Sequence, residues 1–154
     1  MEAESGPQIE ATMLLCDAAQ MMGGKLYILG GGWSIIFSQG QPLMMALAVK
    51  LSVPWDQSNA PVSIRAALVD EDGDAVDVGQ GPVQAAGTIE VGRPPGLKAG
   101  TALDAPFVLP ISGLVLEPGG YFWTLEVHGT ERARTPFRVL QPPPGMMITG
   151  GPSA

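Results

Sequence analysis

Apolar and polar residues alternate with a period of two along several short segments of the chain. In the clearest of these, residues 121–128, Tyr121, Trp123, Leu125 and Val127 alternate with Phe122, Thr124, Glu126 and His128. This spacing places four large apolar side chains on one face of a strand, where they can line a core. The pattern recurs at residues 45–53 and 62–68, and more weakly at 9–15, 83–91, 107–111 and 137–139, and we assign a further strand to 25–37.

Turn-forming residues separate these segments, and the chain contains 21 Gly and 15 Pro. No stretch shows a convincing helical period of 3.6 residues, so at most a short turn is expected near residues 17–22. Many short strands without intervening helices favour an all-β sandwich or barrel over an α/β fold. We predict an all-β fold, an immunoglobulin-like, two-sheet antiparallel β-sandwich of about eight or nine strands.

The length of 154 residues fits a single domain. A chain of this size can bury roughly 68–70% of its unfolded surface without metals or disulfides. We assign the sandwich to residues 9–140, a flexible tail to residues 1–8, and a tail rich in Pro and Gly to residues 141–154. The triple glycine at residues 30–32 lies inside a predicted strand, where it permits a bulge or a close approach of the backbone.

Charge and cysteine content narrow the classes of function and location. The formal net charge is −7, and the eight Lys and Arg are scattered along the chain, so nucleic-acid binding is not expected. Cys16 is the single cysteine, which excludes an intrachain disulfide and favours a reducing compartment. The acidic N-terminus does not resemble a signal peptide, and no apolar run could insert into a membrane. We expect a cytoplasmic protein, or one associated with a particle assembled in the cytoplasm.

Two sets of residues carry resemblances. The run Leu116-Glu117-Pro118-Gly119-Gly120-Tyr121 resembles the tyrosine corner of Greek-key sandwiches, in which the Tyr hydroxyl bonds to the backbone just upstream. Asp17, the run Gly24-Lys25-Leu26-Tyr27-Ile28-Leu29-Gly30, and Val69-Asp70-Glu71-Asp72-Gly73 are similar to elements of a family of uncharacterised bacterial proteins. That resemblance implies a β-sandwich over about residues 9–140 and implies no activity or site residues.

The acidic residues within 70–77 raise the question of a bound cation. Asp70, Asp72 and Asp74 mimic the first three ligands of a calcium loop. The later positions do not fit, because Ala75 and Gly81 stand where such a loop needs Gly and Glu. We therefore favour a hairpin with a type I′ turn at Asp72 and Gly73, and keep a bound cation as the alternative.

The chain shows no recognisable catalytic equipment. Any nucleophile and base pair of thiol and imidazole must use Cys16 and His128, the only cysteine and the only histidine. Alternation places both on outward faces, which favours an inert thiol and a solvated histidine. We predict that the protein is not an enzyme and uses no cofactor or metal.

Candidate partner contacts are the apolar residues that the pattern leaves outside the core. Trp55 lies in a polar connection, residues 54–61. We expect it either to form a lid over one end of the sandwich or to contact a ligand or partner. Phe122 is predicted to point outward beside Thr124, which suggests a covered face. Met146, Met147 and Ile148 follow a polyproline arm and form either a free tail or a clip that docks on another subunit. The Met pairs at 21–22 and 44–45 are interpreted as packing.

These observations favour a non-catalytic structural or protein-interaction module that contacts a protein partner or forms a homo-oligomer. The alternative is a sandwich that binds a small ligand or carbohydrate through loop aromatics such as Trp55.

Overall fold

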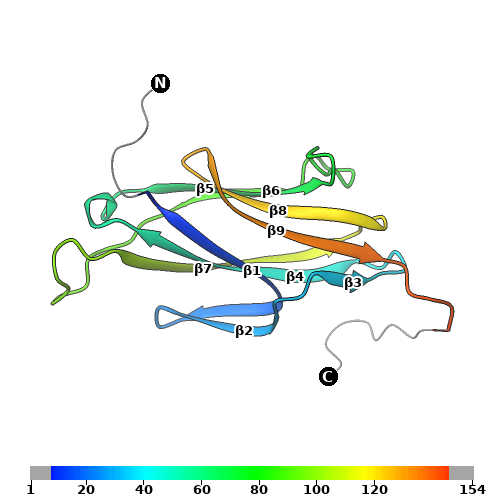
Figure 1. Cartoon of the computed structure of the whole chain (residues 1–154), viewed down its shortest axis with the longest axis horizontal. Helices are drawn as coiled ribbons and strands as arrows, with labels where there is room; N and C mark the ends of the chain where they lie inside the picture. Colours follow the sequence, from blue (N-terminus) through cyan, green and yellow to red (C-terminus); the bar gives the residue numbers. More distant parts are fainter. Residues whose placement is uncertain (1–7, 146–154) are drawn as a thin grey trace.

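The fold, described for residues 8–145 in a computed structural model, consists of nine strands in two sheets (Figure 1). The strands are β1 (Glu10–Met22), β2 (Lys25–Gly31), β3 (Ile35–Phe37), β4 (Leu43–Val53), β5 (Val62–Asp70), β6 (Gln84–Ile89), β7 (Leu103–Leu114), β8 (Gly119–Val127) and β9 (Thr130–Leu140). A 3₁₀ turn, η1 (Trp55–Gln57), follows β4. The predicted all-β sandwich is therefore confirmed.

One sheet has the strand order β2-β1-β4-β7 and the other has the order β3-β9-β8-β5-β6. Their facing sides form one core, to which the alternating residues of β4, β5 and β8 contribute as predicted. Trp123 is only 3% exposed, and its indole Nε1 donates a hydrogen bond to the sulfur of Met45 in the opposite sheet. The periodic segments form these strands because alternation lets each strand bury one side against the other layer.

Three local predictions are wrong. The segment 25–37 is two strands in different sheets, because the chain leaves β2 and crosses to β9 as β3. β3 pairs with β9 in parallel, so the sandwich is not wholly antiparallel. Residues 17–22 do not form a separate turn but continue β1, because their backbone pairs with β2 up to the contact of Met22 with Lys25.

The hairpin formed by the end of β1 and by β2, residues 18–31, folds back across the outer face of the four-stranded sheet. In Figure 1 β1 descends across the molecule and turns back, so that β2 lies below β4 and β7, and both β1 and β2 contact β7. We call residues 18–31 the arm. Beneath it lies a second, small cluster, in which Cys16, Ala46 and Ala48 pack against Ala19 and Leu26 of the arm and against Val108 of β7.

The bend that creates the arm is made by Asp17 and Gly30. Gly30 has a φ of +60°, a left-handed conformation that favours glycine. A Cβ atom at this position would overlap the carboxylate of Asp17. The glycine therefore leaves room for the Asp17 side chain at the point where β1 and β2 bend together.

A side-chain hydrogen bond joins the start of β8 to the turn before it. The hydroxyl of Tyr121 donates a hydrogen bond to the backbone carbonyl of Glu117, at 2.6 Å. The Tyr121 ring stacks on Phe137 of β9, with ring centroids 5.6 Å apart.

Within residues 8–145, no helix has the length and apolar character needed to cross a membrane.

Candidate functional site

The arm presents the main group of exposed large apolar side chains. These are Met21, Met22, Tyr27, Ile28 and Leu29, with Leu14 beside the bend. Leu29 is 72% exposed and Tyr27 is 53% exposed. Residues 18–32 contain a single charged side chain, that of Lys25. Isolated surface apolar residues are common, but a contiguous group with little charge is typical of a contact surface.

The two faces of the arm differ. Ala19 and Leu26 belong to the small cluster under the arm, and Ala19 pairs with Ile28, so these side chains share the side that faces the sheet. Leu29 and Tyr27 occupy the alternate positions and point to solvent. The arm therefore uses one face to cover the sheet and offers the other face to its surroundings.

Among residues 8–145, β2 is also an edge strand, because it pairs with β1 on one side and with no strand on the other. An edge strand exposes unpaired N–H and C=O groups to which another strand can bind. The opposite edge of the same sheet, β7, contains Pro106 and Pro110. Proline has no N–H to donate, so it is tolerated in a strand only where its nitrogen faces the open side.

The predicted packing role of Met21 and Met22 is wrong, since both side chains are about half exposed. The alternation of apolar and polar residues does not mark the arm as a contact surface. The available signal was the run Leu26-Tyr27-Ile28-Leu29, which is apolar at consecutive positions and so cannot bury one face and leave the other polar.

Phe122 lies on the outer face of the five-stranded sheet, as predicted, but it is partly covered. The guanidinium of Arg134 lies over its ring, 4.8 Å from the centroid. The same Arg134 forms two hydrogen bonds, each 3.0 Å, with the carboxylate of Glu131. Phe122 thus belongs to a face that is mostly polar, and its role as a partner contact stays a prediction.

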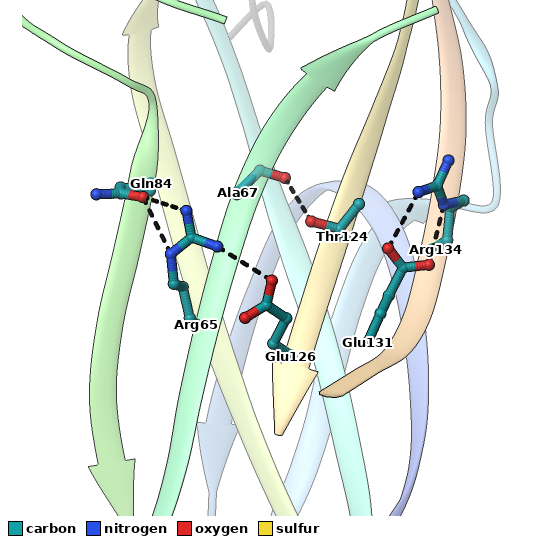
Figure 2. Close-up of polar contacts among 7 residues, drawn as sticks. All are labelled: Arg65, Ala67, Gln84, Thr124, Glu126, Glu131 and Arg134. Carbon is teal, nitrogen blue, oxygen red and sulfur yellow. Dashed lines mark hydrogen bonds and ion pairs between the residues drawn. The ribbon is translucent and has the colours of Figure 1, made fainter. Parts of the chain in front are cut away.

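Figure 2 shows the polar groups of that face, which stand on β5, β6, β8 and β9. Arg65 donates two hydrogen bonds to the side-chain oxygen of Gln84 and one, at 3.2 Å, to Glu126. Thr124 is buried, and its hydroxyl donates to the carbonyl of Ala67 at 3.3 Å. Because these groups bond to one another across neighbouring strands, they link the strands and leave little apolar surface.

Trp55 lies at the opposite end of β5 from Phe122, so the structure does not bring these two residues together. Arg93 stacks on the Trp55 ring at 4.2 Å and donates a hydrogen bond to the Trp55 carbonyl at 2.8 Å. It also donates to the hydroxyl of Ser58 at 2.7 Å. Trp55 borders an open hollow of about 470 Å³ whose other lining residues include Gln8, Glu10, Ser52 and Asp56.

The acidic loop is a hairpin turn, but its type differs from the prediction. The N–H of Gly73 bonds to the carbonyl of Asp70, and Gly73 alone has a positive φ, +84°. A type I′ turn would require a positive φ at Asp72 as well. One carboxylate oxygen from each of Asp70, Asp72 and Asp74 lies within 4.8 Å of the other two. One oxygen of Asp70 already accepts the N–H groups of Asp72 and Asp74, so it serves the turn.

Cys16 is buried although the alternation places it on an outward face, whereas His128 is solvated as expected. Cys16 is on the outer face of its sheet but is fully buried by the arm, and its thiol donates to the carbonyl of Ala46 at 3.3 Å. Burial, followed by the charge of Asp17, raises the pKa of the Cys16 thiol above its usual value of 9.0. His128 is exposed but lies in the turn between β8 and β9, with a φ of +51°.

The remaining predicted contacts, Met146, Met147 and Ile148, lie outside the described residues.

No curated protein matches the sequence. Residues 11–140 match the family of unknown function DUF6941, a span that runs from the start of β1 to the end of β9. The chain therefore belongs to the DUF6941 family of unknown function.

Proposed function

We propose that this chain is a non-catalytic protein-interaction module that binds another protein through the outward face and the edge of the arm. The observation that carries the proposal is the open edge strand β2, whose Tyr27 and Leu29 side chains point to solvent. Burying such apolar side chains in a contact contributes roughly 25 cal/mol per Å² of surface removed from water. An edge strand adds backbone hydrogen bonds to that contribution.

Two features support a role without catalysis. The Cys16 thiol is buried and hydrogen-bonded, and its pKa is raised, so it is a poor nucleophile at neutral pH. The backbone N–H of His128, the only histidine, donates a hydrogen bond to the carbonyl of Ser63 in β5. His128 therefore lies beside one sheet, whereas Cys16 lies in the other sheet. The negative net charge supports a partner other than nucleic acid.

The test compares two substitutions that each add one lysine to an exposed apolar position. Leu29→Lys alters the arm, and Val78→Lys alters the loop after β5 on the other sheet, where Val78 is 45% exposed. Each purified full-length variant is immobilised and used to capture proteins from a lysate of its own source cells. We expect capture to be lost with Leu29→Lys and kept with Val78→Lys. Equal capture by both variants would remove the arm from the proposal.

A second candidate function is small-ligand or carbohydrate binding, favoured by the hollow beside Trp55. Its volume of about 470 Å³ lies in the range of ligand sites. It combines an indole, on which a sugar ring can stack, with the polar side chains of Gln8, Glu10 and Asp56, which can bond to hydroxyl groups. Calorimetric titration with a panel of sugars tests this function. We expect binding to be lost in Trp55→Ala, while Phe122→Ala serves as the control.

We further propose an immunoglobulin-like fold class, a cytoplasmic location and a partner contact at residues 146–148. The bond from Tyr121 to Glu117 supports an immunoglobulin-like tyrosine corner. The lone buried thiol supports a reducing, cytoplasmic compartment, here of a bacterium as the sequence resemblance implies. Met146, Met147 and Ile148 are proposed as a further contact with a protein partner. Truncation after Gln141 is expected to weaken assembly.

A further inference from the structure

We infer that the partner of the arm is a second copy of this chain, joined by antiparallel pairing of β2 with β2 of the other copy across a two-fold axis. The inference rests on the proposed function, because it uses the same edge and the same outward face. It would join the two arms into one four-stranded layer, because β2 pairs mainly with residues 18–22 of β1, beyond the part of β1 that pairs with β4.

The two edges of the four-stranded sheet have opposite properties, and this favours a closed pair. Pro106 and Pro110 of β7 face Lys50 and Ala46 of β4 in the register of the sheet. They are four residues apart, so they lie on the same side of the strand and both remove N–H donors from the open edge. β2 has no proline. Contact of β2 with β7 of another copy, which would extend without end, is therefore disfavoured.

The charge of the arm fits antiparallel self-pairing. Lys25 is the first residue of β2 and the only charged residue of the arm. Antiparallel pairing puts the two Lys25 side chains at opposite ends of the contact, whereas parallel pairing would place them side by side. A copy of the chain thus brings no acidic residue to the centre of the contact, although the whole protein has a net charge of −7.

The side chains also fit when the two-fold axis passes through Ile28. Tyr27 then lies opposite Leu29 of the other copy, an aromatic and aliphatic pair of the kind that stabilises neighbouring strands. Lys25 lies opposite Gly31, which has no side chain to oppose it. Large residues thus meet either an apolar residue or a glycine.

The other open edges offer less for such a contact. β6 exposes mainly small or polar residues, Gln84, Ala85, Ala86, Gly87 and Thr88. β3 has only three residues. β2 spans seven residues, or about 23 Å at 3.3 Å per residue. Because a strand of this length gives a narrow interface, below the roughly 800 Å² per partner of standard complexes, we expect reversible dimers that depend on concentration.

The experiment measures the mass of the full-length protein by sedimentation equilibrium over a wide range of concentrations. We expect the wild type to shift from monomer to dimer, with no larger species. Leu29→Lys should weaken the dimer more than tenfold, because it places like charges near the two-fold axis. Val78→Lys should leave the dimer unchanged. Since Leu29 is largely exposed, circular dichroism and thermal unfolding should show that Leu29→Lys remains folded.

A second measurement locates the contact. Hydrogen exchange at high and low protein concentration should show extra protection of amides in β2, and none in β6 or β7, as the dimer forms. A dimer that resists Leu29→Lys, or that protects another edge, overturns the inference. A wild type that stays monomeric also overturns it. If capture from the lysate still depends on Leu29 in that case, the proposed function survives without self-pairing, and if capture is also absent, both fail.

Discussion

The bend at Gly30 can be tested by adding one methyl group. Gly30→Ala introduces two costs, of which the first is the left-handed backbone conformation, roughly 1–2 kcal/mol for a residue with a Cβ atom. The second is the overlap of the new Cβ with the carboxylate of Asp17, an exposed side chain that must shift, at about 0.5–1.5 kcal/mol, to admit the methyl group. We therefore expect Gly30→Ala to lower the free energy of unfolding by about 1.5–3.5 kcal/mol.

Gly32→Ala provides a matched control. Gly32 has a φ of +86°, but a Cβ there would meet no atom within 4 Å. Gly32→Ala should lower the free energy of unfolding by only roughly 1–2 kcal/mol, the cost of the left-handed backbone conformation. In an Asp17→Ala background the carboxylate is gone, so the additional cost of Gly30→Ala should fall to the level of the control. The coupling between the two positions measures the overlap directly.

Urea and thermal unfolding, followed by tryptophan fluorescence, supply the free energies. For a chain of this size each kcal/mol corresponds to about 2–4 °C in melting temperature. The reactivity of Cys16 toward a thiol reagent gives an independent signal, because an arm that lifts from the sheet exposes this buried thiol. The explanation is refuted if Gly30→Ala costs no more than Gly32→Ala, or if its cost is unchanged without the Asp17 carboxylate.

Three further predictions concern the Tyr121 hydrogen bond, the pH dependence of stability and the edge strand β7. Tyr121→Phe removes the 2.6 Å hydrogen bond to Glu117 and should cost about 1 kcal/mol in urea unfolding, whereas Tyr27→Phe, at an exposed position, should cost nothing measurable. Burial raises the pKa of Cys16, so the neutral thiol stabilises the fold fully below the unfolded pKa of about 9 and less as pH rises above it. Between neutral and alkaline pH, the free energy of unfolding of Cys16→Ala should therefore fall less than that of the wild type. An identical fall in both proteins would contradict the raised pKa of Cys16. The double variant Pro106→Ala/Pro110→Ala should open the edge at β7 and give assemblies larger than a dimer in sedimentation, while unchanged mass would show that the prolines do not block that edge.

The sequence determined the layers of this protein. In β4, β5 and β8 the alternation extends over four or more inward positions, and burial of that set requires a strand with one face on a core. Leu47, Leu125 and Val49 are fully buried on this basis. The Pro-Gly-Gly-Tyr run likewise indicated the Tyr121 bond, because its partner lies only four residues away.

The tertiary structure decided what covers the outward faces. Alternation assigned Cys16, Ala46 and Ala48 to the outside, yet all three are buried, since the arm folds over them. The bend depends on Gly30 meeting Asp17, two residues on different strands, and the cover of Phe122 depends on Arg134 from a neighbouring strand. A local pattern distinguishes the two faces of a strand, but the path of distant segments determines whether an outward face meets water or protein.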